Sequence, residues 1–323
     1  MANQEDVSLK TDQRWSFPLL KKLLIGMIIL HVAFFISYAQ KNDSSEVVLS
    51  EKLFEDVNIF CWVPTKPDNF KTKAKAVKET WAKRCNKFIF ISKIEDLELE
   101  VVALPVEEGT KNLWNKTKAA LIYIYQNYLN QYDWFLKADD DTFMIMENLR
   151  YLLYQYNPLS PIYLGNRLNS SLGEEFMSGG SGYVLSRNAL SRFVEIGMLG
   201  GKYCKQKNDY PPEDMELSKC LKELNVTDID SRDLNGRKRM FSLSPEKHLF
   251  KDESDSWHPE AVGRNCCSSR TISFHYISPA KMYAMEFLLY ELKLFGLKRE
   301  EDELPFKNYS VELYANESIK QQN

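Results

Sequence analysis

The feature that most constrains the fold is an alternation of short apolar segments with segments of helical periodicity. In residues 71–83 and 110–128, apolar side chains recur three and four positions apart, as on one face of a helix. These helical segments alternate with three apolar segments, at 58–63, 87–92 and 133–138. Strand, helix, strand, helix and strand at this spacing predict right-handed βαβ units. The expected fold class is α/β, a Rossmann-like and mostly parallel sheet flanked by helices.

The second helix and the C-terminal half add further expected elements. Thr110 is the expected cap of the second helix. Its expected buried face consists of Leu113, Trp114, Thr117, Leu121, Ile124 and Tyr128. Further strands are expected at 162–165, 182–186 and 271–277, and further helices at 187–196, 213–224 and 279–295.

An apolar run near the N-terminus predicts a membrane anchor. In residues 23–39 only His31 is strongly polar, and the run approaches the length that crosses a bilayer. More Lys and Arg precede the run than follow it, which predicts a cytoplasmic N-terminus. A cleavable signal peptide and a buried core helix are the alternatives. The expected organisation is a cytoplasmic tail at 1–20, an anchor at 21–39, a stem at 40–56, a lumenal folded body at 57–299 and a loosely ordered tail at 300–323.

The cysteines indicate the compartment of the folded body. All six follow residue 60, and they are Cys61, Cys85, Cys204, Cys220, Cys266 and Cys267. An even number in a lumenal body predicts disulfides, although fifteen pairings are open. A zinc site is the alternative, but the chain has no C-x-x-C motif and only four histidines. Six glycosylation sequons also favour the secretory pathway, at Asn42, Asn115, Asn169, Asn225, Asn308 and Asn316.

Three consecutive aspartates, Asp139, Asp140 and Asp141, directly follow the third expected strand. Ligands of open α/β sheets bind beyond the carboxyl ends of the strands. Three adjacent carboxylates repel one another unless a cation lies between them or water solvates them all. Asp139 and Asp141 can project to one side and hold a hard divalent metal, which would neutralise a diphosphate. An acidic turn is the alternative. A net charge of −3, with no long run of like charge, argues against a nucleic-acid partner.

Several stretches resemble the core 1 β1,3-galactosyltransferases, within the Fringe-related β1,3-glycosyltransferase family. The matching stretches are FCWVPT (60–65), KAVKETWAKRCNK (75–87), DWFLKADDDTF (133–143), PIYLGNR (161–167), MSGGSGYVLS (177–186) and SFHYISP (273–279). The doubled cysteine before SFHYISP favours the core 1 branch over Fringe. The resemblance covers roughly residues 55–300.

This resemblance implies a GT-A-type nucleotide-sugar transferase fold and a type II membrane protein of the Golgi. It implies inverting, Mn²⁺-dependent transfer of galactose from UDP-galactose to O3 of N-acetylgalactosamine on Ser or Thr of glycoproteins. The partners that it implies are the donor, acceptor glycoproteins, the Golgi membrane, a second copy of the chain and a dedicated chaperone.

The resemblance also assigns roles to residues. The family's DxD motif maps onto the three aspartates and its Glu-Asp motif onto Glu213 and Asp214, with Asp214 as the general base. The expected metal ligands are Asp139, Asp141 and His275. Residues expected at the nucleotide are Trp81, Lys137, Asp139, Asp140, Gly179 and Gly180. The alternatives are a place in the core for Trp81, an ion pair with the aspartates for Lys137 and a tight turn for the glycines. From the residues alone, Glu213 and Asp214 are typical of a helix N-terminus, and His275 is typical of a structural histidine.

The acceptor contacts are expected from Tyr183 and Trp257. The segment 249–265 is shorter and less aromatic than its counterpart in the family, which keeps a related β1,3-transferase with another acceptor or donor as an alternative. A non-catalytic chaperone that resembles the enzyme is a second alternative. The family's chaperone branch lacks the aspartate cluster, which this chain has. A lumenal lectin-like module is a third alternative.

Overall fold

The computed structural model describes residues 22, 25–32, 49–171, 173–201, 203–206, 212–250, 263 and 265–294. The chain divides into two units, Met1–Glu51 and Lys52–Asn323. Residues 25–32 of the first unit are helical. Within the described residues, no helix has the length and apolarity needed to cross a bilayer. The rest of the predicted anchor and both predicted tails lie outside the described residues.

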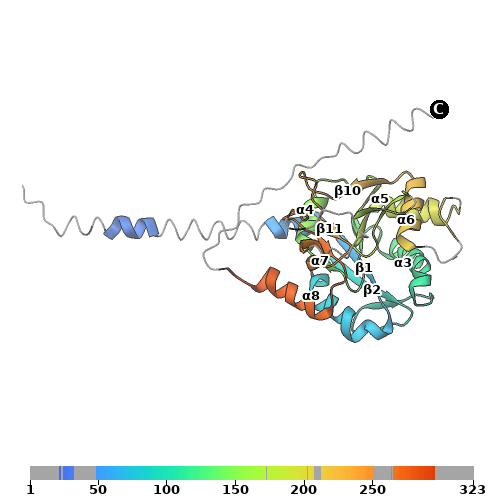
Figure 1. The fold of residues 1–323 in the computed structure, drawn as a ribbon, viewed down its shortest axis with the longest axis horizontal. Helices are drawn as coiled ribbons and strands as arrows, with labels where there is room; N and C mark the ends of the chain where they lie inside the picture. Colours follow the sequence, from blue (N-terminus) through green and yellow to red (C-terminus); the bar gives the residue numbers. More distant parts are fainter. Residues whose placement is uncertain are drawn as a thin grey trace, which may run out of the picture. The chain divides into compact units, whose positions relative to one another are not determined.

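A seven-stranded sheet forms the centre of the second unit, in the order β10-β6-β9-β4-β1-β2-β3 (Figure 1). Neighbouring strands are parallel except where β9 pairs with β4 and β6. The predicted α/β class is therefore confirmed, with one antiparallel strand inside a mostly parallel sheet. The strands are β1 (Ile59–Pro64), β2 (Lys87–Ser92), β3 (Val101–Ala103), β4 (Trp134–Lys137), β6 (Ile162–Gly165), β9 (Tyr183–Ser186) and β10 (Thr227–Asp230).

Helices cover both faces of this sheet and create two cores (Figure 1). Along β1, Ile59, Cys61 and Val63 face one core, whereas Phe60 and Trp62 face the other. The alternation follows from the two-residue period of a strand, and burial on both faces explains why β1 is apolar throughout. The first core also contains residues of α2 (Lys75–Glu79), α4 (Met146–Leu153) and α8 (Pro279–Glu286), and the second contains residues of α3 (Leu113–Tyr128), α5 (Arg187–Arg192) and α6 (Glu213–Glu223).

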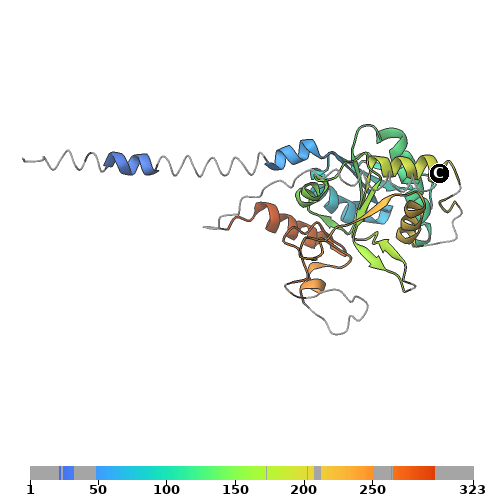
Figure 2. The ribbon, with the colours of Figure 1, turned by 90° about the horizontal axis from the view of Figure 1, so that it is seen from above.

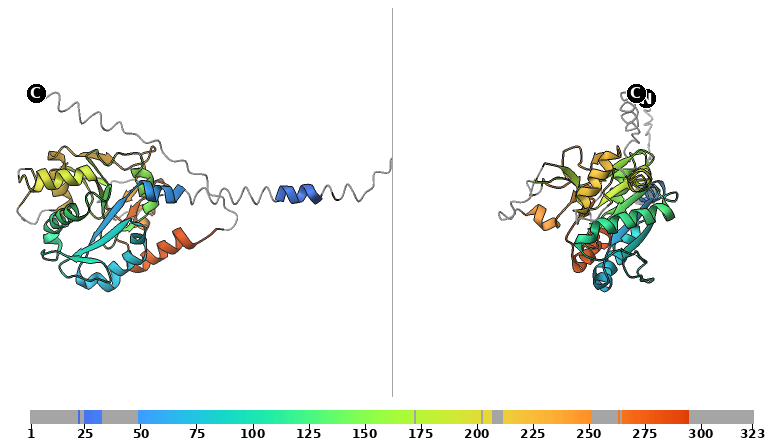
Figure 3. Two further views of the ribbon diagram at one scale, coloured as in Figure 1. Left: turned by 180° about the vertical axis from the view of Figure 1, so that it is seen from behind. Right: turned by 90° about the vertical axis from the view of Figure 1, so that its right-hand side faces the viewer.

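The helix predicted for residues 71–83 is present as three consecutive turns of different type. A π-helical turn, η2 (Phe70–Ala74), leads into α2, and a 3-10 turn, η3 (Trp81–Arg84), follows. Figure 3 shows α8 alongside this segment. The guanidinium of Arg84 makes two hydrogen bonds, of 2.9 and 2.7 Å, to the buried carboxylate of Glu286. This paired contact joins η3 to α8 across 202 residues of sequence.

The second predicted helix, α3, begins differently from the expectation. Thr110 does not cap it, because residues Thr110–Asn112 form the 3-10 turn η4 and Asn112 occupies the cap position without a side-chain hydrogen bond. Within the predicted face, Trp114 and Leu121 are fully buried, but Leu113 is 38% exposed. Leu113 lines the cleft described below instead of packing in the second core.

Residues 49–56, within the predicted stem, form a helix. Leu53 on this helix is buried in the first core. The guanidinium of Arg150 lies 4.6 Å from the ring centroid of Phe54, and Asn86 donates a hydrogen bond to the carbonyl of Phe54. The end of the predicted stem is therefore packed onto the folded body.

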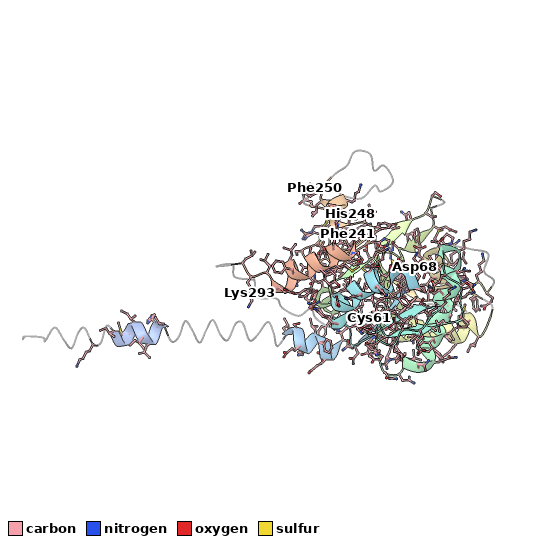
Figure 4. The ribbon with its side chains drawn as sticks, turned by 90° about the horizontal axis from the view of Figure 1, so that it is seen from below. Cys61, Asp68, Phe241, His248, Phe250 and Lys293 are labelled. Carbon is pink, nitrogen blue, oxygen red and sulfur yellow. A yellow bond between two sulfur atoms is a disulfide. The ribbon has the colours of Figure 1, made fainter. Side chains whose placement is uncertain are left out.

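A three-stranded sheet, β11-β12-β5, lies beside the main one. The strand predicted for 271–277 is reduced to β12 (Ser273–Phe274), because its partners are only two residues long and Tyr276 adopts a positive φ of 56°. Phe241 stacks on Phe274 with ring centroids 5.0 Å apart and contacts His248 at 4.6 Å (Figure 4). The other elements are β5 (Phe143–Met144), β7 (Arg167–Asn169), β8 (Glu175–Met177), β11 (Met240–Phe241), α7 (Pro245–Leu249), η1 (Pro67–Asn69), η5 (Phe193–Met198) and η6 (Phe287–Glu291).

The hairpin of β7 and β8 projects from the body (Figure 2).

All six cysteines form disulfides, and the pairs are Cys61–Cys85, Cys204–Cys220 and Cys266–Cys267. The prediction of disulfides is confirmed and the zinc alternative is wrong, since no thiol remains to bind a metal.

Candidate active site

The aspartate cluster lies at the carboxyl end of β4, at the centre of the sheet. The backbone turns there, with Thr142 N donating to Asp139 O at 3.0 Å. The hydroxyl of Thr142 also donates to the carbonyl of Gly180 at 2.7 Å, which joins the cluster to the glycine-rich segment before β9. The four residues of β4 are buried, whereas Asp139 and Asp141 are partly exposed. The strand therefore ends where carboxylates can reach a ligand.

Asp140 differs from its two neighbours. Its side chain is nearly buried, and its Oδ2 accepts hydrogen bonds from Thr65 Oγ1 at 2.7 Å and from Asn69 Nδ2 at 2.8 Å. Burial raises the pKa of this carboxyl, while these hydrogen bonds lower it in part. The prediction that Asp140 contacts the nucleotide is wrong for its side chain, because its carboxylate turns inward and anchors the acidic turn to the end of β1.

Asp139, Asp141 and His275 form the candidate metal site. One ligand atom from each lies within 4.8 Å of the others. His275 Nε2 lies 3.1 Å from Asp141 Oδ1 and 3.7 Å from Asp139 Oδ2. Two carboxylate oxygens and one imidazole nitrogen are a donor set that fits a divalent ion such as Mn²⁺. The three residues predicted as metal ligands are therefore brought together in one place.

His275 is oriented by contacts with the small sheet and with Tyr276. Its backbone N donates to Phe241 O at 3.2 Å, and its Nδ1 lies 3.3 Å from Ser242 O. A carbonyl at Nδ1 favours the tautomer that presents Nε2 as a ligand. The ring also stacks on that of Tyr276, at 3.9 Å between centroids. β11 and the residue that follows it therefore help to orient the ring of His275.

Asp141 is the most strongly stabilised carboxylate of the cluster. Its Oδ2 accepts a 2.8 Å hydrogen bond from Lys73 Nζ, and its Oδ1 faces His275. Burial raises the pKa of Asp141, but the hydrogen bonds of His275 and Lys73 outweigh it and lower the pKa to about 2. The carboxylate is therefore ionised throughout the neutral range, as a metal ligand must be.

Gly180 makes room for His275. A Cβ atom at residue 180 would lie 2.3 Å from His275 Cε1 and 2.4 Å from its Nδ1, far inside van der Waals contact. At Gly179 the nearest atom would be Glu213 Oε2 at 3.0 Å, followed by Lys137 Nζ at 3.3 Å. These are close approaches that a side chain would obstruct. Both predicted glycines thus lie at the site, and the lack of space for a Cβ atom is more severe at Gly180 than at Gly179.

Asp214 and Glu213 begin α6 on the other side of the glycine-rich segment. Asp214 is half-buried, and its two carboxylate oxygens accept from Gly179 N and Met215 N, each at 3.0 Å. Each of these oxygens keeps a second lone pair for another donor. Asp214 therefore has a defined orientation together with remaining capacity to accept a proton.

Glu213 has a different environment from Asp214. Its Oε1 accepts from Tyr183 OH at 2.7 Å and from Thr117 Oγ1 at 2.9 Å, inside the body. Burial raises the pKa of Glu213, and the ammonium of Lys137 opposes this effect. Glu213 therefore connects α6 to α3 and β9. Both residues line the cleft, and Asp214 is the more exposed of the two.

A cleft of about 410 Å³ connects Asp139 and the two glycines to Glu213 and Asp214. Lys137 is one of the residues that line it, and its Nζ is 2.6 Å from Asp139 Oδ1 and 3.0 Å from Gly179 O. Burial lowers the pKa of Lys137, but Asp139 and Glu213 more than offset this and raise it. The ammonium thus holds positive charge beside the acidic cluster. The lining residues are Thr110, Lys111, Leu113, Lys137, Asp139, Gly179, Gly180, Pro212, Glu213 and Asp214.

Two predicted contact residues are not accessible. Trp81 and Tyr183 are both 0% exposed, so neither can touch a nucleotide or an acceptor sugar. Trp81 packs in the first core, and Tyr183 uses its hydroxyl to hold Glu213. Both predicted contacts are wrong, and the alternative for Trp81, a place in the core, is confirmed. An aromatic side chain next to a site contributes more free energy by burial when the sheet offers it a core. Trp257 lies outside the described residues.

Three residues at the cluster were not predicted, namely Thr65, Asn69 and Lys73. All three belong to the segment from the end of β1 to η2, about 70 residues before the aspartates. A signal existed in the sequence, because the carboxyl ends of neighbouring parallel strands meet at one edge of the sheet. Polar residues directly after β1 were therefore candidates for contact with those after β4.

A family model described as Fringe-like matches residues 54–293. The chain belongs to this Fringe-like family. Among its relatives, the glycoprotein-N-acetylgalactosamine 3-beta-galactosyltransferase 1 of Xenopus laevis is 41% identical over 257 residues, which are 77% of this chain and 70% of the relative. The beta-1,3-glucosyltransferase of Mus musculus is 28% identical over 180 residues, 51% of this chain and 36% of the relative. The predicted resemblance is confirmed.

Among solved structures, a Drosophila beta-1,4-galactosyltransferase mutant in complex with manganese, UDP-Gal and xylobiose matches 77% of this chain and 83% of its own. The sequences are 12% identical and the TM-score is 0.37. A TM-score this low carries no argument about function, so membership of the Fringe-like family rests on the family model and on the Xenopus relative.

Proposed function

We propose that this Fringe-like protein is an inverting glycosyltransferase with a GT-A-type body. It transfers galactose from UDP-galactose to O3 of N-acetylgalactosamine on Ser or Thr of glycoproteins, with Mn²⁺ as cofactor. The observation that carries the proposal is that Asp139 belongs to two groups at once, the candidate metal site with Asp141 and His275 and the lining of the cleft that Asp214 also lines. The name of the Xenopus relative supports the donor sugar and the acceptor.

The chemistry follows from the two halves of the cleft. Asp139, Asp141 and His275 would hold the Mn²⁺, which supplies Lewis-acid stabilisation of the leaving diphosphate. On the other side, Asp214 accepts the proton of the acceptor hydroxyl as its oxygen attacks the anomeric carbon. The new glycosidic bond forms while the bond to UDP breaks on the opposite face, so the configuration inverts. Lys137 stabilises the negative charge at this end of the cleft.

The carboxylate of Asp214 is suited to this role by its fixed orientation. Gly179 N and Met215 N occupy one lone pair on each oxygen and prevent the side chain from rotating away. A base that is already positioned loses little entropy when the acceptor binds. Gly179 belongs to the segment that carries Gly180, so the base and the room for His275 depend on the same piece of backbone.

The proposal is tested by Asp214→Asn in the full chain. We expect UDP binding in the presence of Mn²⁺ to stay within about twofold, while galactose transfer to a GalNAc-bearing glycopeptide falls by about 10²–10⁴-fold, the typical contribution of a general base. Mass spectrometry measures the product and calorimetry measures UDP binding. Glu216→Gln, in the same helical turn, is the control and should retain both properties.

Loss of UDP binding in Asp214→Asn would mean that this residue serves only to hold Gly179. A screen of other UDP-sugars and acceptors with the unaltered chain separates the proposed reaction from that of a related β1,3-transferase. If no sugar is transferred to any acceptor, the chaperone alternative gains support.

We propose further that the protein is a single-pass type II protein of the Golgi membrane, with residues 21–39 as the anchor and the body in the lumen. Three disulfides in the body support an oxidising compartment. Exposed sequons at Asn169 and Asn225 also support it. Protease protection of sealed microsomes tests the orientation, since a cytoplasmic body would be digested without detergent. The homodimer and the dedicated chaperone stay predictions.

A further inference from the structure

Lys73 is the cation at the aspartate cluster to which the reaction described so far gives no role. Its Nζ lies 2.8 Å from Asp141 Oδ2 and 3.6 Å from Asp140 Oδ1. The residue belongs to η2, a π-helical turn, and such turns are frequent at functional sites. Asn69, directly before η2, donates a hydrogen bond to the carboxylate of Asp140, which holds this segment against the acidic turn. Lys73 is thus placed beside a predicted metal ligand by the surrounding structure.

Lys73 and Lys137 neutralise the cluster in different ways. Lys137 pairs with Asp139, is 4% exposed and also donates to Gly179 O, so it is fixed inside the body. Lys73 pairs with Asp141, its side chain is 33% exposed, and its Nζ contacts are with carboxylates. Its long side chain has room to reorient toward solvent. Of the two cations, Lys73 is the one that can change partner.

A divalent ion bound to Asp141 weakens the ion pair between Asp141 and Lys73. The ion neutralises the charge of the carboxylate and repels the neighbouring ammonium. A nucleoside diphosphate that shares this ion brings new negative charge next to Lys73. Lysine ammonium groups bind phosphate oxygens well as mobile point charges.

We propose that Lys73 is a diphosphate-binding residue that exchanges partners. Without ligand it pairs with Asp141 and competes with the metal ion for that carboxylate. When the ion and a nucleoside diphosphate bind, Lys73 transfers its hydrogen bond from Asp141 to the diphosphate. This inference rests on the proposed function, because it presumes a UDP-sugar donor at the cluster.

Lys73→Met in the full chain tests the exchange by two binding measurements that should change in opposite directions. Without nucleotide, Mn²⁺ should bind about two- to fivefold more tightly, because a partly exposed ion pair no longer competes. At saturating Mn²⁺, UDP should bind about tenfold more weakly or worse, because a charge-assisted hydrogen bond is lost. Electron paramagnetic resonance measures free Mn²⁺, and calorimetry measures UDP binding.

Two further variants complete the design. Lys75→Met removes a more exposed lysine two residues away, whose contact is Glu79 at 3.8 Å, and should leave both affinities unchanged. Lys73→Arg keeps the charge and should restore most of the UDP affinity. A merely structural role of Lys73 would lower both affinities together, and that result would overturn the inference.

The two levels of proposal fail differently. If the unaltered chain binds UDP with Mn²⁺ but Lys73→Met binds it equally well, only the exchange by Lys73 is refuted. If the unaltered chain does not bind UDP at any Mn²⁺ concentration, the proposed function fails and the role of Lys73 fails with it.

Discussion

The strictest geometric requirement of the candidate site is the absence of a side chain at Gly180, and Gly180→Ala tests it directly. The added Cβ would lie 2.3 Å from His275 Cε1, 2.4 Å from Nδ1 and 2.9 Å from Nε2. Carbon atoms in contact normally stay about 3.5 Å apart or more, so the ring must retreat by about 1 Å. Since the clash is with three ring atoms rather than one flexible end, His275 has to move as a whole.

The size of the effect follows from what this movement disturbs. In the structure, His275 Nε2 lies 3.1 Å from Asp141 Oδ1, close enough for both atoms to bind one ion. Metal–ligand bond lengths tolerate deviations of only about 0.2 Å, so a shift of the ring by about 1 Å would disrupt this arrangement. We therefore expect Gly180→Ala to bind Mn²⁺ about 10–100-fold more weakly, as when the support of a metal ligand is removed. The overpacking should also lower the free energy of unfolding by about 1–3 kcal/mol.

Titration of the full chain with Mn²⁺, followed by electron paramagnetic resonance, measures the affinity, and urea denaturation measures the stability. Gly179→Ala is the matched control, because its Cβ would meet Glu213 Oε2, Lys137 Nζ and Asp214 Cβ at 3.0–3.4 Å, and none of these residues is a predicted metal ligand. That variant should bind Mn²⁺ nearly as well as the unaltered chain. If Gly180→Ala also binds Mn²⁺ with unchanged affinity, His275 is not a metal ligand and the assignment of the site is refuted.

Two further predictions concern the ionisation and packing of the site. In the presence of a chelator, the pKa of Asp141 is about 2, compared with an ordinary value of 3.8. This difference contributes about 2 kcal/mol to the free energy of unfolding above pH 4, and the contribution disappears as the pH falls toward 2. Asp141→Asn should therefore be less stable at pH 7 but not at pH 2, as urea midpoints at both pH values will reveal. Tyr183→Phe removes a buried 2.7 Å hydrogen bond to Glu213 and should cost about 1–3 kcal/mol in the free energy of unfolding. The same variant should leave the KM for the acceptor unchanged, and a raised KM would revive Tyr183 as an acceptor contact.

Much of the central sheet could be predicted from local pattern. The segments at 87–92 and 162–165 coincide with β2 and β6, since a strand buried on both faces is a continuous apolar run. Short elements such as β5 and β11 were not predicted. Each has two residues, too few to show a period, and each exists only through its pairing with β12.

The candidate site was predicted in its acidic residues but not in its contacts. Asp139 and Asp141 were predicted as metal ligands from their position after an apolar strand, and His275 was assigned by a family resemblance. The structure brings the three together across 136 positions of sequence. The sequence placed Asp139 and Asp141 on one side, but it did not reveal that the carboxylate of Asp140 turns inward to Thr65 and Asn69. Three adjacent aspartates have the same chemistry, and only the turn after β4 decides which of them faces solvent.

By itself, the sequence determined the α/β class, the position of the acidic cluster after β4 and the presence of disulfides, because these follow from period, composition and cysteine number. Tertiary structure alone decided the depth of each aromatic side chain, as Trp81 and Tyr183 demonstrate, and the pairing of the cysteines. It also decided that Lys73 meets Asp141. The physical reason is that burial and ion pairing depend on which distant segments pack together. Periodicity along the chain shows which face of a segment is buried, but it does not identify the residues that pack against that face.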